Sequence, residues 1–335
     1  MRRTLIKGTG RYVPDRLVTN DDLTRWMDTS DEWIVQRTGI KQRYWVPEEG
    51  GVGASDLGLE AAKIALDKAG WKPEDIDLII FATLSPDIFF PGSGCLLQAK
   101  LGLETTPALD IRQQCTGFLY GVATTDAYIR SNMANRVLFV GAEVHSTGLD
   151  ISTTGRDVTV IFGDGAAAVC FEAGEGDESV GVLASALHAQ GELAESLMLE
   201  APASREMPRI DEQMLKDGKH YPHMDGKTIF KNALKRLPEV THEALAMAGL
   251  ELDDIDLFIP HQANLRINQF YQQSMKIPEG KVYNNIDKYG NTTAATIPLA
   301  LDEVIEHGMI TSGSTLMFLG LGSGVTWGAC IYRFA

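Results

Sequence analysis

A thiol, an imidazole and an amide stand at the ends of apolar segments that are far apart in the chain: Cys115, His261 and Asn291. Cys115 follows the apolar residues 107–109 and begins the helix-like run 116–131. Unpaired backbone N–H groups and the positive end of a helix dipole stabilise a thiolate, so this place lowers the pKa of a cysteine from about 8.5. Although most lone cysteines are small buried apolar residues, we interpret Cys115 as a candidate nucleophile.

His261 and Asn291 are weaker candidates on position alone. His261 follows the strand-like segment 254–260, and ligands collect at the carboxyl ends of strands in α/β sheets. A structural and a catalytic histidine both fit this place. Asn291 lies at the entrance of a helix-like run, where asparagine commonly caps a helix but could instead donate its amide N–H into a cleft. No histidines or cysteines have the spacing of a metal site.

Two glycine-rich segments offer backbone N–H groups. Residues 318–328, "FLGLGSGVTWG", include an apolar strand and then a turn whose N–H groups can point at a developing oxyanion. Residues 161–169, "IFGDGAAAV", are interpreted as a hairpin turn between two strands. Neither segment lies between a strand and a helix, as a dinucleotide-binding fingerprint requires, so a Rossmann-type cofactor site is excluded.

The elements that must position these residues come from two similar halves. Residues 61–83 and 241–262 are each an amphipathic helix ending in Ala-Gly, a short acidic link and a strand. Their Asp-Ile-Asp-Leu matches, at 75–78 and 254–257, are offset by 179 residues, and so are the apolar strands 137–141 and 316–320. One offset at two separate places indicates a duplication. Because it brings Cys115 onto Ala294, we expect equivalent helices after Cys115 and Asn291, facing each other.

Each half alternates helices with nearly continuous apolar strands, which is typical of parallel sheets buried on both faces. We therefore predict an α/β protein with an N-terminal half at 1–180 and a C-terminal half at 181–335, related by a pseudo-twofold axis. Further strands are expected within 4–14, 158–173 and 324–334. The polar segment at about 201–223 is interpreted as a surface excursion or lid rather than a linker.

Composition limits the functional class. The 335 residues are 44% hydrophobic and carry a net charge of −15, so a chain with a large core that repels nucleic acid is expected. No apolar run is long enough for a membrane span, and the N-terminus has no apolar segment of the signal-peptide kind. The four scattered cysteines favour reduced thiols in the cytoplasm.

Several motifs together resemble one family. "QQCTGF" around Cys115, "PHQANLRI" around His261 and "YGNTTAATIPLAL" around Asn291 are similar to the Cys-His-Asn triad segments of 3-oxoacyl-ACP synthase III, in the thiolase superfamily. "DEWIVQRTGI", "MDGKTIFKNAL" and "GSGVTWG" extend the resemblance over nearly the whole chain. It implies a thiolase-like fold of two duplicated βαβαβ halves in a five-layer αβαβα arrangement.

The resemblance also implies a chemistry. Cys115 would take an acyl group from acyl-CoA, with the backbone N–H groups of Cys115 and Ser323 as the oxyanion hole. Malonyl-ACP would then lose CO2, and His261 Nε2 and Asn291 Nδ2 would hydrogen-bond the enolate oxygen. No metal or redox cofactor is implied.

By the same resemblance, further residues would bind the substrates and a second subunit. Phe90 would reach into the acyl pocket of a partner subunit, which implies a homodimer. CoA would be held by Trp33, Arg37, Thr38 and Arg156. A basic set in this acidic chain would either dock the acidic carrier protein or be solvated helix surface: Lys231, Lys235, Arg236 and Arg266.

Some features depart from the family pattern. Gln113, Gln114 and Thr116 replace smaller residues around the cysteine, and the 201–223 excursion is longer than usual. An unusual acyl primer is therefore expected. The alternatives are a related thiolase-superfamily enzyme, such as one for head-to-head acyl-CoA condensation or acyl transfer, and an inactive homologue that binds carrier protein. Phe90 favours decarboxylative chemistry, because the head-to-head enzymes place a glutamate near that position.

Overall fold

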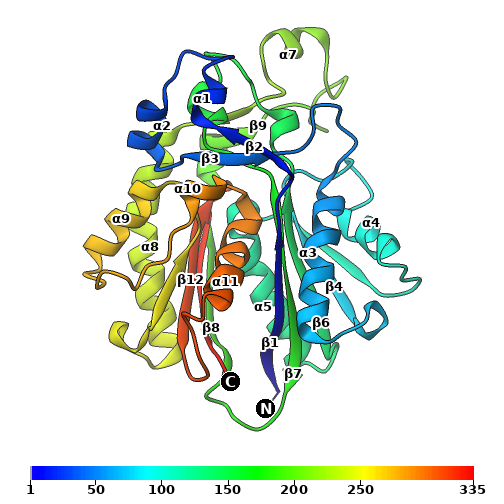
Figure 1. Cartoon of the computed structure of the whole chain (residues 1–335), viewed down its shortest axis with the longest axis vertical. Helices are drawn as coiled ribbons and strands as arrows, with labels where there is room; N and C mark the ends of the chain where they lie inside the picture. Colours follow the sequence, from blue (N-terminus) through cyan, green and yellow to red (C-terminus); the bar gives the residue numbers. More distant parts are fainter. Residues whose placement is uncertain (1) are drawn as a thin grey trace.

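The computed structural model describes residues 2–335 and contains two large mixed sheets that lie side by side (Figure 1). The first sheet has the strand order β1 (Arg3–Tyr12), β7 (Gly165–Gly174), β6 (Arg136–Glu143), β4 (Leu78–Ala82) and β5 (Ala108–Ile111). The second has the order β11 (Leu257–Pro260), β12 (Thr315–Gly322), β13 (Thr326–Arg333) and β8 (Gly181–Ala189). The two sheets thus come from successive parts of the chain, on either side of the β7–β8 connection.

Helices form three layers around these sheets (Figure 1). The outer face of the first sheet is covered by α3 (Ala54–Ala69) and α4 (Ser93–Lys100), and that of the second by α8 (Gly226–Ala248) and α9 (Leu265–Ser274). Between the sheets lie α5 (Gly117–Arg130) and α11 (Thr296–Glu306). This is the five-layer αβαβα, thiolase-like arrangement that the sequence predicts.

The duplication is visible element by element. The offset of 179 residues carries β6 onto β12, the 3-10 turn η2 (Gln114–Thr116) onto η6 (Thr293–Ala295), and η1 (Pro73–Asp75) onto η5 (Leu252–Asp254). It also carries the first residue of α5 onto the first residue of α11. Where a methyl at Gly117 would lie, Ala294 Cβ is 3.0 Å away, so the two central helices meet at their N-termini.

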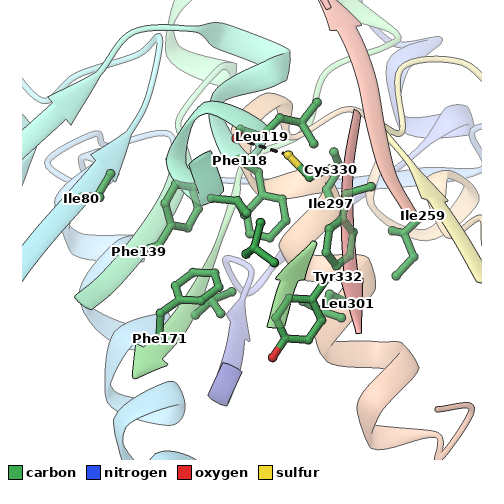
Figure 2. Packing of buried hydrophobic residues seen from close by; sticks show 14 of the residues in the cluster. Ile80, Phe118, Leu119, Phe139, Phe171, Ile259, Ile297, Leu301, Cys330 and Tyr332 are labelled. Atoms are coloured by element: carbon green, nitrogen blue, oxygen red, sulfur yellow. Dashed lines mark hydrogen bonds between the residues drawn. The ribbon is translucent and has the colours of Figure 1, made fainter. Parts of the chain in front are cut away.

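The central core holds these two helices in register with both sheets (Figure 2). Phe118, near the start of α5, lies 5.3 Å from Phe139 of β6 and 5.3 Å from Phe318 of β12, both in edge-to-face geometry. Phe139 and Phe318 are themselves related by the 179-residue offset. Each such aromatic pair contributes about 0.5–1.5 kcal/mol beyond its buried area, so the residue three positions after Cys115 is fixed by both halves.

A cap covers one end of the sheets (Figure 1). It contains the antiparallel pair of β2 (Arg16–Thr19) and β3 (Gln42–Trp45). Four short helices pack with this pair: α1 (Asn20–Leu23), α2 (Asp31–Thr38), α6 (Arg156–Thr159) and α10 (Ile286–Tyr289). At the same end, β9 (Leu197–Leu199) pairs with β10 (Pro222–Met224), and the 201–223 segment between them carries α7 (Glu212–Lys216). No helix within residues 2–335 is both long and apolar enough to cross a membrane.

Two expectations about strands are wrong. The sheets are mixed rather than parallel, because β7 runs antiparallel to both β1 and β6, and β13 antiparallel to both β12 and β8. The segment 161–169 is no hairpin turn: α6 precedes it and a single bridge joins Phe162 to Asn291. The carboxylate of Asp164 accepts backbone N–H groups from Val46, His145 and Ser146, which holds this segment across the sheet end.

The halves also differ in strand number. The first sheet has β5 at its edge, whereas the residues offset by 179 from β5 fall in α10. In the second half, Val282 makes an isolated parallel bridge with Phe258 of β11 instead of a strand. On this side the second sheet therefore ends at β11, whereas the first sheet continues beyond β4 to β5.

Candidate active site

Cys115 lies in η2, the tight turn that leads into α5. The residue before it, Gln114, has φ 44°, and Thr293, which the duplication places opposite, has φ 48°. Non-glycine residues avoid this left-handed region, at a cost of about 1–3 kcal/mol, and persist there only when their surroundings enforce it. Both central helices thus start from an equivalent strained turn.

The glycine turn between β12 and β13 closes on the sulfur. A methyl group at Gly322 would lie 2.9 Å from Sγ of Cys115 and 3.1 Å from its backbone nitrogen, so only glycine fits here. This approach brings the backbone N–H of Ser323 close enough to Sγ to lower the pKa of the thiol, as does the N–H of Cys115 itself. Two N–H groups from different halves therefore converge at the thiol.

The charge state of the thiol differs from the sequence-based expectation. Complete burial and the nearby carboxylate of Glu143 raise the pKa of Cys115 to about 12, although the two N–H groups act to lower it. The expected lowering by a helix start is thus outweighed. Cys115 is a protonated thiol at neutral pH.

Glu143 is a site residue that sequence reasoning missed. It is fully buried at the end of β6 and accepts hydrogen bonds from the Thr83 hydroxyl (3.0 Å), the Ser85 hydroxyl (2.6 Å) and the Leu84 N–H (3.1 Å). Burial raises its pKa to about 7 in spite of these donors. A carboxylate at the end of the apolar run "VLFVGAE" was the available signal, because such groups are rarely buried unless hydrogen-bonded.

His261 is brought next to the Cys115 turn by Gly320. A methyl group at Gly320 would lie 3.0 Å from His261 Cβ and 3.6 Å from the carbonyl oxygen of Cys115. Burial lowers the pKa of His261 to about 3, so the ring is neutral. Its Nδ1 lies 2.7 Å from the Thr296 hydroxyl, while Nε2 has no partner among the described residues. The single proton of the Thr296 hydroxyl has two acceptors within reach, Nδ1 of His261 and the carbonyl oxygen of Thr293. When it goes to Nδ1, Nε2 carries the ring proton and is available as a donor.

Asn291 is held by the residues around it. Its Oδ1 accepts the N–H of Thr293 at 2.8 Å, and its backbone N–H donates to Ile161 at 2.9 Å. Because a backbone N–H requires an acceptor, the oxygen end of the amide is fixed and the Nδ2 end is left for other contacts. The hydrogen bond from the Thr293 N–H to Asn291 Oδ1 is a structural turn contact of the kind expected for an asparagine at a helix entrance. It also fixes the orientation of the Nδ2 donor.

Thr293 connects the second-half residues and was also missed. Its N–H donates to Asn291, its carbonyl oxygen lies 3.0 Å from the Thr296 hydroxyl oxygen, and its own hydroxyl lies 2.8 Å from Nε2 of His145. His145 is buried against Phe162, with ring centroids 4.6 Å apart. Thr293, which has a strained backbone, therefore positions Asn291 directly and His261 through Thr296.

A cavity of about 550 Å³ adjoins the thiol. Cys115, Gln114, Thr293 and Ser323 line it at one place. Its other walls come from the loop 84–89, from residues 144–149, and from strand β9 with both ends of the 201–223 excursion. The excursion is thus a wall of the cavity, and the Ser323 hydroxyl, which donates to the carbonyl of Leu197, joins that wall to the glycine turn.

Three of the four expected CoA residues lie together in the cap. The guanidinium carbons of Arg37 and Arg156 are 4.2 and 4.8 Å from the ring centroid of Trp33. Thr38 does not join them: it is buried at the end of α2, and its hydroxyl donates to Ile34. Thr29 is the better candidate, since its hydroxyl oxygen is buried without a partner among residues 2–335 and its neighbour Asp28 accepts a hydrogen bond from Arg156.

The basic set divides into two kinds. Lys231 and Lys235 on α8 and Arg266 on α9 are exposed and form no ion pair within the described chain, and Arg266 lies 5.8 Å from the ring centroid of Phe230. Arg236 instead pairs with Glu239 at 2.9 Å and stacks on Trp327. The open cationic surface therefore consists of Lys231, Lys235 and Arg266.

Phe90 projects from the molecule. Its exposed fraction is 76%, and those of the preceding Phe89 and Ile88 are 55% and 50%. Phe89 also lines the cavity and carries Arg209 of the excursion over its ring, 5.0 Å from the centroid. An apolar tip of this kind marks a surface that another molecule covers.

Protein-family models match both halves of this site. Residues 109–191 match the model described as 3-oxoacyl-[acyl-carrier-protein (ACP)] synthase III, and residues 245–334 match its C-terminal counterpart. The first match contains Cys115, and the second contains His261 and Asn291.

Solved structures of whole enzymes are similar over nearly the full chain. The 3-oxoacyl-[acyl-carrier-protein] synthase III of Aquifex aeolicus VF5 is 40% identical, with a TM-score of 0.88 and 99% and 100% of the two chains covered. The corresponding synthase of Thermus thermophilus is 37% identical, with a TM-score of 0.89 and 99% coverage of both chains. That of Pseudomonas aeruginosa PAO1 is 34% identical, with a TM-score of 0.89 and coverages of 99% and 98%.

Proposed function

This chain belongs to the 3-oxoacyl-[acyl-carrier-protein] synthase III family of condensing enzymes, and on that premise we propose that it joins an acyl-CoA primer to malonyl-ACP by decarboxylative Claisen condensation. The products are 3-oxoacyl-ACP, CoA and CO2, in fatty acid or related lipid or polyketide synthesis. One observation carries the proposal: a buried thiol at a cavity wall receives two backbone N–H groups and has the His261 and Asn291 segments beside it.

In the first half-reaction, Cys115 Sγ attacks the carbonyl carbon of the acyl-CoA thioester. The new S–C bond forms as the bond to the CoA sulfur breaks, and the proton of the Cys115 thiol ends on that sulfur. The N–H groups of Ser323 and Cys115 stabilise the oxyanion of the tetrahedral intermediate. Because the thiol is protonated at rest, its deprotonation belongs to this step rather than preceding it.

In the second half-reaction, malonyl-ACP loses CO2 and its thioester becomes an enolate. His261 Nε2 and Asn291 Nδ2 donate hydrogen bonds to the enolate oxygen, whose charge exists only near the transition state. The enolate carbon then attacks the acyl-cysteine, and the Cys115 sulfur leaves and takes up a proton from solvent. Neutral His261 suits this role, because burial keeps the ring uncharged until the enolate forms.

Both substrates enter over cationic surface. We assign CoA to the Trp33, Arg37 and Arg156 cluster with Thr29, where a ring can stack on a base and guanidinium groups can pair with phosphate. The acidic carrier protein is assigned to Lys231, Lys235 and Arg266, since the net charge of −15 would otherwise repel it.

We also propose that the protein is a homodimer. The exposed tip at Phe90 and the free edge of β5 both suit burial against a partner subunit. Burying a phenylalanine contributes about 1.5–3 kcal/mol, so Phe90→Ser is expected to weaken dimerisation roughly tenfold or more. Sedimentation equilibrium measures this; a wild-type chain that is monomeric at micromolar concentration contradicts the dimer.

Mass spectrometry of the intact protein tests the reaction. After incubation with an acyl-CoA, we expect an adduct of one acyl group that is absent from Cys115→Ala and retained by Cys95→Ala, whose thiol is exposed and outside the cavity lining. Since the pKa of Cys115 is about 12, adduct formation should accelerate as pH rises through the neutral and mildly alkaline range without a plateau.

The same experiment separates the alternatives. Release of the acyl group as 3-oxoacyl-ACP on addition of malonyl-ACP supports the proposed condensation. An adduct that malonyl-ACP does not discharge, but that a second acyl-CoA or an alcohol does, indicates a related condensation or acyl transfer. Absence of an adduct with every acyl-CoA indicates the inactive, carrier-binding homologue.

A further inference from the structure

Three polar side chains that line the cavity beside Cys115 form no hydrogen bond to the rest of the described chain through at least one polar atom. Arg112 lies just before η2 and Gln114 is its first residue, and neither side chain forms a hydrogen bond or ion pair within residues 2–335. The third is His220, at the end of the excursion, whose Nδ1 is buried without a partner in the described chain. A buried polar atom of this kind calls for a ligand that satisfies it, and the exposed guanidinium of Arg112 is a free cation at the same cavity.

The charge balance of the cavity is positive. Arg112 is a permanent cation, and Asp87 is the one carboxylate among the described lining residues. Asp87 is already bound by the Ser55 hydroxyl (2.7 Å), the Ser55 N–H (3.1 Å) and the Ser93 hydroxyl (2.7 Å). Its hydrogen-bonding capacity is largely used, whereas that of Arg112 is free.

These walls are poorly suited to a purely hydrocarbon primer. An alkyl chain that filled the cavity would leave Nδ1 of His220 unpaired and would displace water from the cavity side of Gln114 without replacing its hydrogen bonds. A site built to hydrogen-bond a substrate group rejects the analogue that lacks it far more strongly than an apolar pocket rejects an extra methylene. The donors of Arg112 are free to bind a substrate group, and a carboxylate matches the guanidinium fork in charge and geometry.

We propose that the primer of this enzyme is an acyl-CoA whose acyl chain ends in a carboxylate, held by Arg112 with help from Gln114 and His220. The inference rests on the proposed function, because it places the acyl chain of the Cys115 thioester in this cavity. The thioester end lies at Ser323 and Cys115, and the free carboxylate lies toward Arg112. The 201–223 excursion thereby becomes a specificity element through His220.

The test compares primers of equal chain length with and without a terminal carboxylate: succinyl- against butyryl-CoA, glutaryl- against valeryl-CoA, and adipyl- against hexanoyl-CoA. The readout is the rate of adduct formation on Cys115 by intact-protein mass spectrometry, which needs no malonyl-ACP. For at least one pair, the carboxylated primer is expected to react roughly tenfold or more faster. Arg112→Gln should remove this preference, by slowing the carboxylated primer and accelerating its partner.

Arg205→Gln is the matched control, since Arg205 is an exposed excursion residue paired with Glu206 and outside the cavity; it should keep the wild-type preference. His220→Phe should reduce the rate advantage of the carboxylated primer over the alkyl primer without abolishing it. Faster reaction of the alkyl primer in all three pairs, or an unchanged preference in Arg112→Gln, overturns the inference while the proposed function stands. Absence of any adduct with all six primers and with acetyl-CoA overturns the proposed function itself, and the inference with it.

Discussion

Gly322→Ala is expected to stop acylation of Cys115 almost completely. The added methyl would lie 2.9 Å from Sγ and 3.1 Å from the backbone nitrogen of Cys115, and still closer to its Cβ. One side must therefore shift, although Cys115 is held in the strained η2 turn and Gly322 is paired with Thr326 in the sheet. A displacement of about 1 Å at a reacting centre can reduce the rate by roughly 10²-fold, and here the oxyanion donors of Ser323 move as well.

The measurement is the rate of adduct formation from acyl-CoA, together with the denaturant midpoint of unfolding. Overpacking of this kind costs about 1–3 kcal/mol, so the variant should still fold. Gly191→Ala is the control, since a methyl there meets no atom of the described chain within 4 Å and should change neither quantity. Wild-type acylation in Gly322→Ala would show that the turn between β12 and β13 does not shape the nucleophile's surroundings.

Asn291→Ala is expected to separate the two half-reactions. Acylation of Cys115 should remain within a few-fold of wild type, because its oxyanion donors are backbone groups from other segments. Decarboxylation of malonyl-ACP should slow by roughly 10²–10³-fold, the usual effect of removing one donor from a developing oxyanion. Release of 14C-labelled CO2 from malonyl-ACP by the acyl-enzyme, set against the adduct rate, measures both.

A second variant separates donation from positioning. Asn291→Asp keeps an oxygen that can accept the Thr293 N–H but loses the Nδ2 donor. It should acylate like the wild type and decarboxylate as poorly as Asn291→Ala, or worse, because a carboxylate would repel the enolate. Equal loss of acylation and decarboxylation in both variants would contradict a role confined to the enolate and would point to collapse of the Thr293 turn.

The duplicated architecture accounts for the way the site is assembled. The proposed nucleophile and one proposed oxyanion donor come from η2 of the first half, and the other proposed donor comes from the β12–β13 turn of the second. Equivalent turns with positive φ at Gln114 and Thr293 start the two central helices. The first half uses this turn to present a thiol, and the second uses it to fix Asn291 and, through Thr296, His261.

Much of this was accessible from the sequence, because hydrophobic periodicity and internal repetition are local properties of a chain. The 179-residue offset predicted the equivalence of β6 with β12 and of the turns at Cys115 and Ala294, which the structure confirms. The motifs around Cys115, His261 and Asn291 indicated the family, which the comparisons establish. Three of the residues that the resemblance assigns to CoA, Trp33, Arg37 and Arg156, lie together, whereas the Thr38 hydroxyl donates to its own helix; CoA binding itself stays a prediction.

The tertiary structure alone decided the electrostatics of the site and its hydrogen-bond connections. Whether a helix start lowers the pKa of Cys115 depends on how much water and which charges surround the thiol, and burial beside Glu143 reverses the expected direction. His145, Thr293 and Thr296 act through bonds to residues distant in the chain, so no local pattern marks them. Glu143 had one local signal, a carboxylate at the end of an apolar strand, but its hydrogen bonds to the 83–85 loop appear only in the fold. The polar wall that Arg112 and His220 give the cavity likewise exists only after the excursion folds back over the nucleophile.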